Sequence, residues 1–248
     1  MVMKKIQDFL DATYLKVAGV DEASIKEDLL LLDELLQEAL SEKYKCVMIR
    51  PCHVAKAKHY FIHNKSQVLV GTVIDFPFGN AGVEAKLKEA TEVIENGADE
   101  LDFVIDYTAF KNGLISQVKN EVKLCTELAL KHNKVVKWII ETAALNDTEI
   151  IKITTLIKKV VVRYFKETDY HKVFVKTSTG FYPTQAGVSN GASPHVVTLI
   201  LENATPLNVK ASGGVKTFEE AVFYLILGVK RIGTSSQKQI VSIAKHRL

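Results

Sequence analysis

The fold class is clearest in one stretch of the chain, Val173-Phe174-Val175-Lys176-Thr177-Ser178-Thr179-Gly180. Its first half is a short run of β-branched and aromatic residues, a composition typical of a buried strand. Its second half is a turn of small residues. Lys176 stands between the two, near the carboxyl end of the predicted strand. The stretch therefore has the form of a strand that delivers a polar side chain to a loop.

Seven further β-rich runs accompany this one. The eight runs occupy residues 10–15, 46–50, 68–75, 100–106, 135–141, 173–177, 207–212 and 229–233. Segments of helical period lie between them, for example residues 22–43, 82–96, 115–132 and 147–166. Strands that alternate with helices predict parallel strands joined by helical crossovers.

Eight such units in 248 residues predict a (β/α)8 TIM barrel, formed as a single domain over residues 1–248. A doubly wound open sheet is the structural alternative. That architecture usually has fewer strands and often carries a glycine fingerprint after the first strand, and the sequence has no such fingerprint.

Composition excludes several classes of protein. Apolar residues make up 47% of the chain, enough to form a core and to exclude dominant disorder. The net charge of +3 is too small for a dedicated nucleic-acid binder. Three cysteines argue against a disulfide framework, and no apolar run approaches the ~20 residues of a membrane helix. The amino end is polar and lacks a signal peptide, so we expect a reduced, cytoplasmic protein without nucleic-acid or membrane partners.

Asp102 is unexpectedly polar for its position. In the run 100–106, alternation places Leu101, Phe103 and Ile105 on the helix-facing side. Asp102, Val104 and Asp106 would then point into the barrel. A carboxylate in an enclosed interior is costly unless it has a partner or a chemical role. A buried ion pair with Lys or Arg is the purely structural explanation.

Two lysines occupy matching positions at the ends of neighbouring strands. Lys176 precedes the turn 178–180, and Lys210 precedes Gly213 and Gly214. One strand lysine is most often a surface residue that extends to solvent. Two ammonium groups ~5 Å apart at an effective dielectric of ~20 would repel by roughly 3 kcal/mol, or about two pKa units. That repulsion would favour a neutral amine, which attacks carbonyls and forms a Schiff base. Such chemistry permits cleavage of a neighbouring carbon–carbon bond.

Three short turns rich in Gly, Ser and Thr follow the last three runs. They occupy residues 178–180, 212–214 and 233–236. Loops after strands seven and eight, with a helix amino terminus, form the usual phosphate site of these barrels. Each turn alone is an ordinary loop, but together they predict a phosphorylated substrate.

The sequence favours no metal site. Cys46, Cys52, His53, His59 and His63 match no zinc spacing, and Cys46 is predicted to be a buried thiol. The basic pair Lys158-Lys159 is predicted to be a solvated helix face.

Seven segments resemble the 2-deoxyribose-5-phosphate aldolase family. They cover residues 10–16, 70–79, 97–102, 137–142, 175–180, 209–214 and 231–236, in order through nearly the whole chain. The most specific are Lys176-Thr177-Ser178-Thr179-Gly180 and Lys210-Ala211-Ser212-Gly213-Gly214. The resemblance implies a (β/α)8 barrel with no metal and no organic cofactor.

The resemblance also assigns roles to individual residues. It implies that Lys176 forms the Schiff base, that Lys210 tunes Lys176, and that Asp102 relays protons. Asp11 resembles a supporting acidic position near the site. The candidate substrate- and phosphate-binding residues are Asp11, Thr179, Gly180, Gly213, Gly214, Ser235 and Ser236.

The sequence departs from the family pattern in three places. Residues 181–190 form a longer stretch than the family usually has, which we interpret as a lid or an interface loop. The chain ends at Leu248 without the extended tail of some members, so no role of a tail in proton transfer is carried over. Phe78 stands where His is common, a mild packing change.

The predicted function is reversible cleavage of 2-deoxy-D-ribose 5-phosphate into acetaldehyde and D-glyceraldehyde 3-phosphate. The predicted partners are therefore small phosphosugars and aldehydes, and the resemblance suggests a homo-oligomer. Two alternatives stay open. A Schiff-base lyase for another phosphosugar would share Lys176, and a comparison of donor aldehydes and ketones separates it. A non-catalytic phosphometabolite-binding barrel would bind ligand without forming a covalent adduct.

Overall fold

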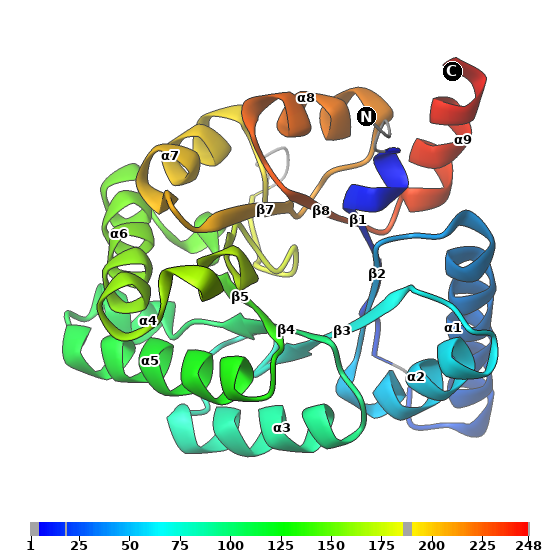
Figure 1. Ribbon diagram of the computed structural model, residues 1–248, viewed down its shortest axis with the longest axis horizontal. Helices are drawn as coiled ribbons and strands as arrows, with labels where there is room; N and C mark the ends of the chain where they lie inside the picture. The colour runs from blue at the N-terminus through cyan, green and yellow to red at the C-terminus, as the bar shows by residue number, and fades with distance from the viewer. Residues whose placement is uncertain (1–4, 18, 186–189, 248) are drawn as a thin grey trace.

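A computed structural model describes residues 5–17, 19–185 and 190–247 of the chain. The strands in this part are all parallel and close into one barrel in chain order, with β1 beside β8. Figure 1 shows the helices arranged around the outside of this closed sheet. The (β/α)8 TIM barrel predicted from the sequence is confirmed, and an open doubly wound sheet is excluded.

The elements follow the alternation seen in the sequence. The strands are β1 (Leu10–Tyr14), β2 (Cys46–Ile49), β3 (Leu69–Ile74), β4 (Glu100–Val104), β5 (Val135–Ile139), β6 (Val173–Lys176), β7 (Asn208–Ser212) and β8 (Arg231–Thr234). The helices are α1 (Glu22–Glu42), α2 (Val54–His63), α3 (Val83–Glu95), α4 (Tyr107–Lys111), α5 (Ile115–Lys131), α6 (Asp147–Tyr164), α7 (Pro194–Ala204), α8 (Phe218–Leu227) and α9 (Gln237–Arg247). Short 3-10 turns are η1 (Ile6–Phe9), η2 (Pro51–His53), η3 (Thr142–Ala144) and η4 (Glu167–Lys172).

Local chemistry explains where the helices begin and end. α6 begins at Asp147 because Asn146 and Glu149 form a reciprocal capping box. α3 ends at Glu95, and Gly97 follows with φ +98°, a conformation that glycine adopts without steric cost. The segments of helical period at residues 82–96 and 147–166 thus match α3 and α6 to within two residues at each end.

The prediction for Asp106 is wrong. β4 ends at Val104, and Asp106 instead caps α4, where its carboxylate accepts a hydrogen bond from the Ala109 N–H at 2.7 Å. Short Asp side chains bond readily to nearby backbone N–H groups, and this local bond ends the strand alternation.

The main apolar core lies between the barrel and its helices. Phe103 and Trp138 point outward from β4 and β5 and stack with ring centroids 5.2 Å apart. Inside the barrel, a small apolar cluster fills the side of β2 and β3, where Cys46, Met48 and Val73 are buried. The charged side chains of the interior come from the other strands, β1 and β4 to β8. Because the apolar cluster occupies the side of β2 and β3, the polar groups that could take part in a reaction lie on β1 and β4 to β8.

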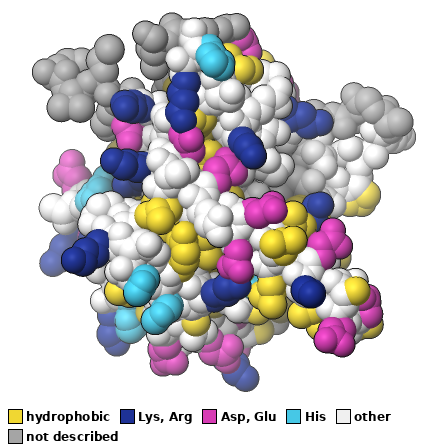
Figure 2. All heavy atoms as spheres, turned by 90° about the vertical axis from the view of Figure 1, so that its right-hand side faces the viewer, with side chains coloured by type: hydrophobic (Ala, Val, Ile, Leu, Met, Phe, Trp, Pro, Cys, Tyr) yellow, Lys and Arg dark blue, Asp and Glu magenta, His cyan; other side chains and the backbone are white. Residues whose placement is uncertain are grey.

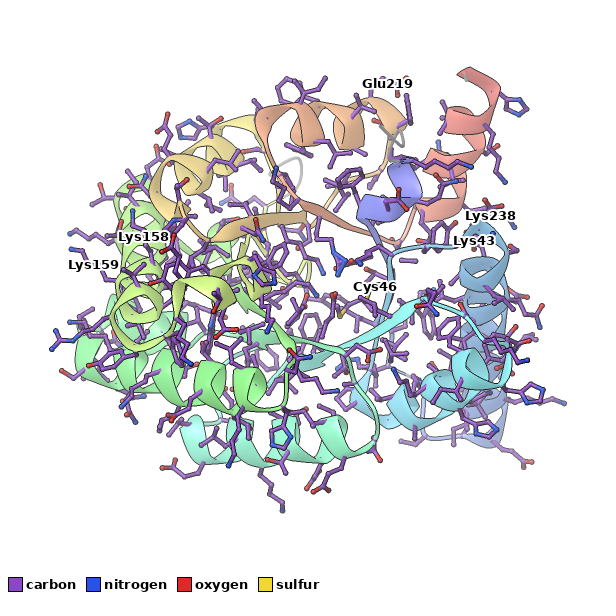
Figure 3. The ribbon with its side chains drawn as sticks, in the orientation of Figure 1. Lys43, Cys46, Lys158, Lys159, Glu219 and Lys238 are labelled. Atoms are coloured by element: carbon purple, nitrogen blue, oxygen red, sulfur yellow. The ribbon has the colours of Figure 1, made fainter. Side chains whose placement is uncertain are left out.

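The remaining sequence expectations concern cysteines and surface charge. The three cysteines are free, and Figure 3 shows Cys46 near the middle of the molecule, among the strands. Figure 3 also places Lys158 and Lys159 on the outer side of α6. On the face in Figure 2, acidic and basic side chains are interspersed with hydrophobic ones. Within the described ranges, no helix has both the length and the apolar character required to cross a bilayer.

Candidate active site

Three predicted residues meet inside the barrel. Lys176 on β6 and Lys210 on β7 are in register with each other. Both ammonium groups donate to the same atom of Asp102 on β4, the Oδ2 oxygen, at 2.8 Å and 2.9 Å. Because both Nζ atoms contact one oxygen, the ammonium groups of Lys176 and Lys210 are close neighbours inside the barrel. All three side chains are buried.

Asp102 also holds a third cation. Its Oδ1 atom accepts a hydrogen bond from Lys137 Nζ on β5 at 2.7 Å. Burial alone would raise the pKa of this carboxyl. The ammonium groups of Lys137, Lys176 and Lys210 outweigh that effect and hold the pKa of Asp102 well below its usual range. Asp102 is therefore ionised and shared among three amines.

A second layer of charges lies beneath the first. Lys137 also contacts Glu100 at 2.7 Å, and Glu100 pairs with Arg231 on β8. Asp11 on β1 pairs with Lys210 and lies 3.3 Å from Arg231. These side chains come from strands far apart in the sequence, and parallel strands around a closed sheet bring them together. The interior thus contains one continuous ion-pair network.

The charges of this network do not balance when every group is ionised. Three carboxylates (Asp11, Glu100, Asp102) face four cations (Lys137, Lys176, Lys210, Arg231). The acids raise the pKa of Lys137 and Arg231, so neither loses its proton. Lys176 differs from these two cations, because its pKa is lowered to about 8, mainly by burial. The charge of Lys210 lowers this pKa further, and the carboxylate of Asp102 opposes the shift. The predicted repulsion from Lys210 is present, but removal of Lys176 from water has the larger effect.

Lys176 is also the cation of this network that reaches a cavity. The cavity has a volume of about 430 Å³ at the carboxyl ends of the strands. Its walls are Thr13, Tyr14, Leu15, Lys16, Lys176, Thr179, Gly180, Phe181, Ser212, Gly213, Gly214, Val215, Lys216, Gly233, Thr234 and Ser235. A ligand in this cavity meets an amine that is partly neutral near pH 8.

Most of the predicted phosphate residues lie together at this cavity. Thr179, Gly180, Gly213, Gly214 and Ser235 line it. Gly213 has φ +86°, and a Cβ there would lie 2.7 Å from the Cα of Gly191. Only glycine therefore allows the two loops to approach this closely.

Two predicted substrate residues lie elsewhere. Ser236 is not part of the wall, and its N–H donates to Thr234 Oγ1 at 2.9 Å. Asp11 is buried beneath the cavity, where it contacts Lys210 instead of the open space. This position agrees with a supporting acid better than with a direct ligand of an anionic phosphate.

The loop after β6 contributes an aromatic wall. Phe181 lines the cavity and meets Phe76 edge to face, with centroids 5.1 Å apart. Residues 186–189 of the longer stretch 181–190 lie outside the described residues. Phe78 is 65% exposed, and its ring is not part of the cavity wall.

The donor set inside the barrel fits a metal poorly. Among the described residues, Asp11, Cys46 and Glu100 lie close enough together to be considered as ligands. Both carboxylates are already paired with cations, and burial raises the pKa of the Cys46 thiol well above its usual value. A metal ion would have to displace Lys210 and Arg231 from these carboxylates and remove the thiol proton.

Sequence reasoning missed several site residues. Glu100 and Arg231 stand at the first positions of their strands, and nothing local indicates that they pair across the barrel. Lys137 and Glu141 are charged residues within the predicted strand run 135–141, and no role was predicted for them. Glu141 holds the turn at Thr179 through its side chain. Lys16 and Lys216, which add positive charge to the cavity wall, had no distinguishing signal.

Comparison with known proteins identifies the family of this chain. A family model described as DeoC/LacD family aldolase matches residues 15–228. The deoxyribose-phosphate aldolase of Thermococcus gammatolerans is 36% identical over 247 residues, which cover 99% of both chains. The protein of the same name from Caldicellulosiruptor saccharolyticus is 35% identical and covers 98% of this chain and 99% of its own.

Solved structures give the same result. An aldolase designated QR15 aligns with a TM-score of 0.80 at 31% identity and covers 100% of this chain and 98% of its own. The tetrameric deoxyribose phosphate aldolase of Aeropyrum pernix aligns with a TM-score of 0.76 at 30% identity, over 98% of this chain and 92% of its own. The barrel thus has counterparts of known structure, and the chain belongs to the DeoC/LacD family of aldolases.

Proposed function

We propose that this aldolase cleaves 2-deoxy-D-ribose 5-phosphate reversibly into acetaldehyde and D-glyceraldehyde 3-phosphate through a Schiff base on Lys176. The observation that carries the proposal is the position of Lys176, a cavity-lining amine with a pKa of about 8 inside a network of three acids and four bases. The names of the relatives support the choice of substrate.

The first step forms the covalent intermediate. The lone pair of neutral Lys176 attacks C1 of the open-chain aldehyde, and the aldehyde oxygen takes up a proton. Loss of water from the carbinolamine then gives a protonated Schiff base. Lys210 and Asp102, in contact at 2.9 Å, supply and accept the protons. Because three ammonium groups hold Asp102 ionised, it relays protons between neighbours rather than storing one.

The second step breaks the carbon–carbon bond. Removal of the C3 hydroxyl proton forms the carbonyl of D-glyceraldehyde 3-phosphate, and the electrons of the C2–C3 bond move into the Schiff base. The enamine left on Lys176 gains a proton at C2. Hydrolysis then releases acetaldehyde and regenerates the amine. A cationic Schiff base inside a network that tolerates one surplus positive charge supports this step.

The phosphate end is assigned to the loops after β7 and β8. Backbone N–H groups near Gly213, Gly214 and Ser235, and the amino end of α9, suit a dianion. Lys16 and Lys216 add positive charge to the same wall. We also expect a homo-oligomer, because the Aeropyrum pernix relative is described as tetrameric, and light scattering after gel filtration tests this.

Turnover with defined substrates tests the proposal. The chain should release both aldehydes from 2-deoxy-D-ribose 5-phosphate, and in the reverse direction it should accept acetaldehyde in preference to dihydroxyacetone. Lys176→Met should abolish turnover, whereas Lys158→Met, on the outer side of α6, should not. Preference for dihydroxyacetone would indicate a lyase for another phosphosugar. Ligand binding without turnover would indicate a binding protein.

A further inference from the structure

Glu141 is a buried carboxylate for which the proposed mechanism has no use. It follows β5, is 1% exposed, and adopts φ +54° and ψ +69°. Residues other than glycine seldom adopt this left-handed conformation, and surrounding contacts must hold them there. Such strain often marks a residue whose side chain must point in one direction.

The side chain of Glu141 is directed at Thr179, in the loop after β6. One oxygen, Oε2, accepts hydrogen bonds from both the backbone N–H of Thr179, at 3.2 Å, and its hydroxyl. The other oxygen, Oε1, is buried without a hydrogen-bond partner. An ionised carboxylate has no proton and can only accept, so both the N–H and the hydroxyl of Thr179 donate to Oε2 of the ionised Glu141.

These contacts determine how the Thr179 hydroxyl can bind a ligand. A hydroxyl has one proton to donate and two lone pairs. The Thr179 proton is directed at Glu141, and one lone pair accepts the Phe181 N–H at 3.0 Å. One lone pair is left, and Thr179 lines the cavity. Thr179 can therefore accept a hydrogen bond from a ligand but has no proton to donate to a phosphate oxygen.

We propose that Glu141 is a positioning residue that fixes the Thr179 hydroxyl as an acceptor, so that this wall of the cavity recognises a hydroxyl group on the substrate carbon chain rather than its phosphate. This inference rests on the proposed function. It refines the prediction that placed Thr179 with the phosphate-binding residues. It also predicts that the acceptor aldehyde is selected for the hydroxyl beside its carbonyl.

Two acceptor aldehydes test the inference. D-Glyceraldehyde 3-phosphate carries one hydroxyl, and 3-oxopropyl phosphate is the same molecule without it. The measurement is the ratio of kcat/KM for the two acceptors, with acetaldehyde as donor. A neutral hydrogen bond corresponds to a change of about threefold to tenfold in this ratio. Glu141→Ala and Thr179→Val should each lower the preference for the hydroxylated acceptor by about that factor.

Conservative variants distinguish positioning from general damage. Glu141→Gln keeps an amide oxygen that can accept from Thr179, and Thr179→Ser keeps the hydroxyl, so both should retain the preference within about twofold. Equal losses on both acceptors in Glu141→Ala and Thr179→Val would overturn the inference, because they would indicate a structural or phosphate-binding role. If Glu141→Ala does not fold, an unchanged ratio in Thr179→Val has the same meaning.

Trapping on Lys176 keeps this test separate from the proposed function. Acetaldehyde alone has no hydroxyl, so borohydride reduction with acetaldehyde should label Lys176 in all four variants. If the wild-type chain is not labelled, the proposed function fails. If labelling persists and the acceptor ratio does not change in Glu141→Ala and Thr179→Val, only the role of Glu141 fails.

Discussion

Lys176 is the residue whose titration controls the proposed reaction. An amine attacks only after it loses its proton, and the pKa of Lys176 is about 8 because burial disfavours its charged form. The neutral fraction therefore grows as pH rises. We predict that the rate of borohydride trapping with acetaldehyde rises about tenfold per pH unit below pH 8 and levels off above it. A rate that still climbs at pH 10 would mean an ordinary lysine.

Asp102 is predicted to be essential as a proton relay. Asp102→Asn removes the negative charge and one of the two oxygens that accept from the lysines, so turnover should fall by about 10²–10⁴-fold. The control is Asp147→Asn, since Asp147 is an exposed carboxylate on α6 whose partner is His195. Steady-state kinetics of both variants provide the measurement. Turnover in Asp102→Asn within a few fold of wild type would contradict the relay.

At the scale of elements, the pair Glu100 and Arg231 links β4 to β8 across the barrel. Arg231→Met leaves Glu100 with Lys137 and Asp11 with Lys210 as their remaining cations, and this loss of a buried ion-pair partner should lower the free energy of unfolding by up to about 3–5 kcal/mol. Replacing both partners, in Glu100→Met with Arg231→Met, should recover much of that loss. Denaturant unfolding of the three variants tests this, and simply additive losses in the double variant would rule out the coupling.

The sequence predicts the elements better than the contacts between them. The β-rich runs located all eight strands, and the segments of helical period placed the start of α6 and the end of α3 to within one residue. Strand ends were extended too far, as at Asp106 and Glu141, because a polar residue in register looks the same whether it continues a strand or ends it. Local patterns also carry no information on pairing between residues as distant as Glu100 and Arg231.

Lys176, Lys210 and Asp102 were accessible from the sequence for a different reason. Each is a charged residue at an inward position of an apolar strand, which is costly without a partner or a role. Their mutual contacts follow from closure of the barrel in chain order. Glu141 had the same signal, but its direction depends on a left-handed backbone conformation that the sequence does not indicate.

At the scale of the whole molecule, the barrel interior supplies its own countercharges. The carboxylates of Asp11 and Glu100 are paired with protein cations, which leaves them poorly suited to a metal ion. We predict that dialysis against EDTA leaves turnover unchanged. If dialysis abolishes turnover and a divalent cation restores it, the reaction requires a metal ion and the prediction is wrong.

Peptide mapping after borohydride reduction with acetaldehyde tests the central claim most directly. In the native chain, reduction should add an ethyl group to one peptide, the one that contains Lys176, and Lys176→Met should abolish the adduct. An unmodified Lys176 peptide, or an adduct on Lys210 with Lys176 left free, would contradict the assignment of the Schiff base.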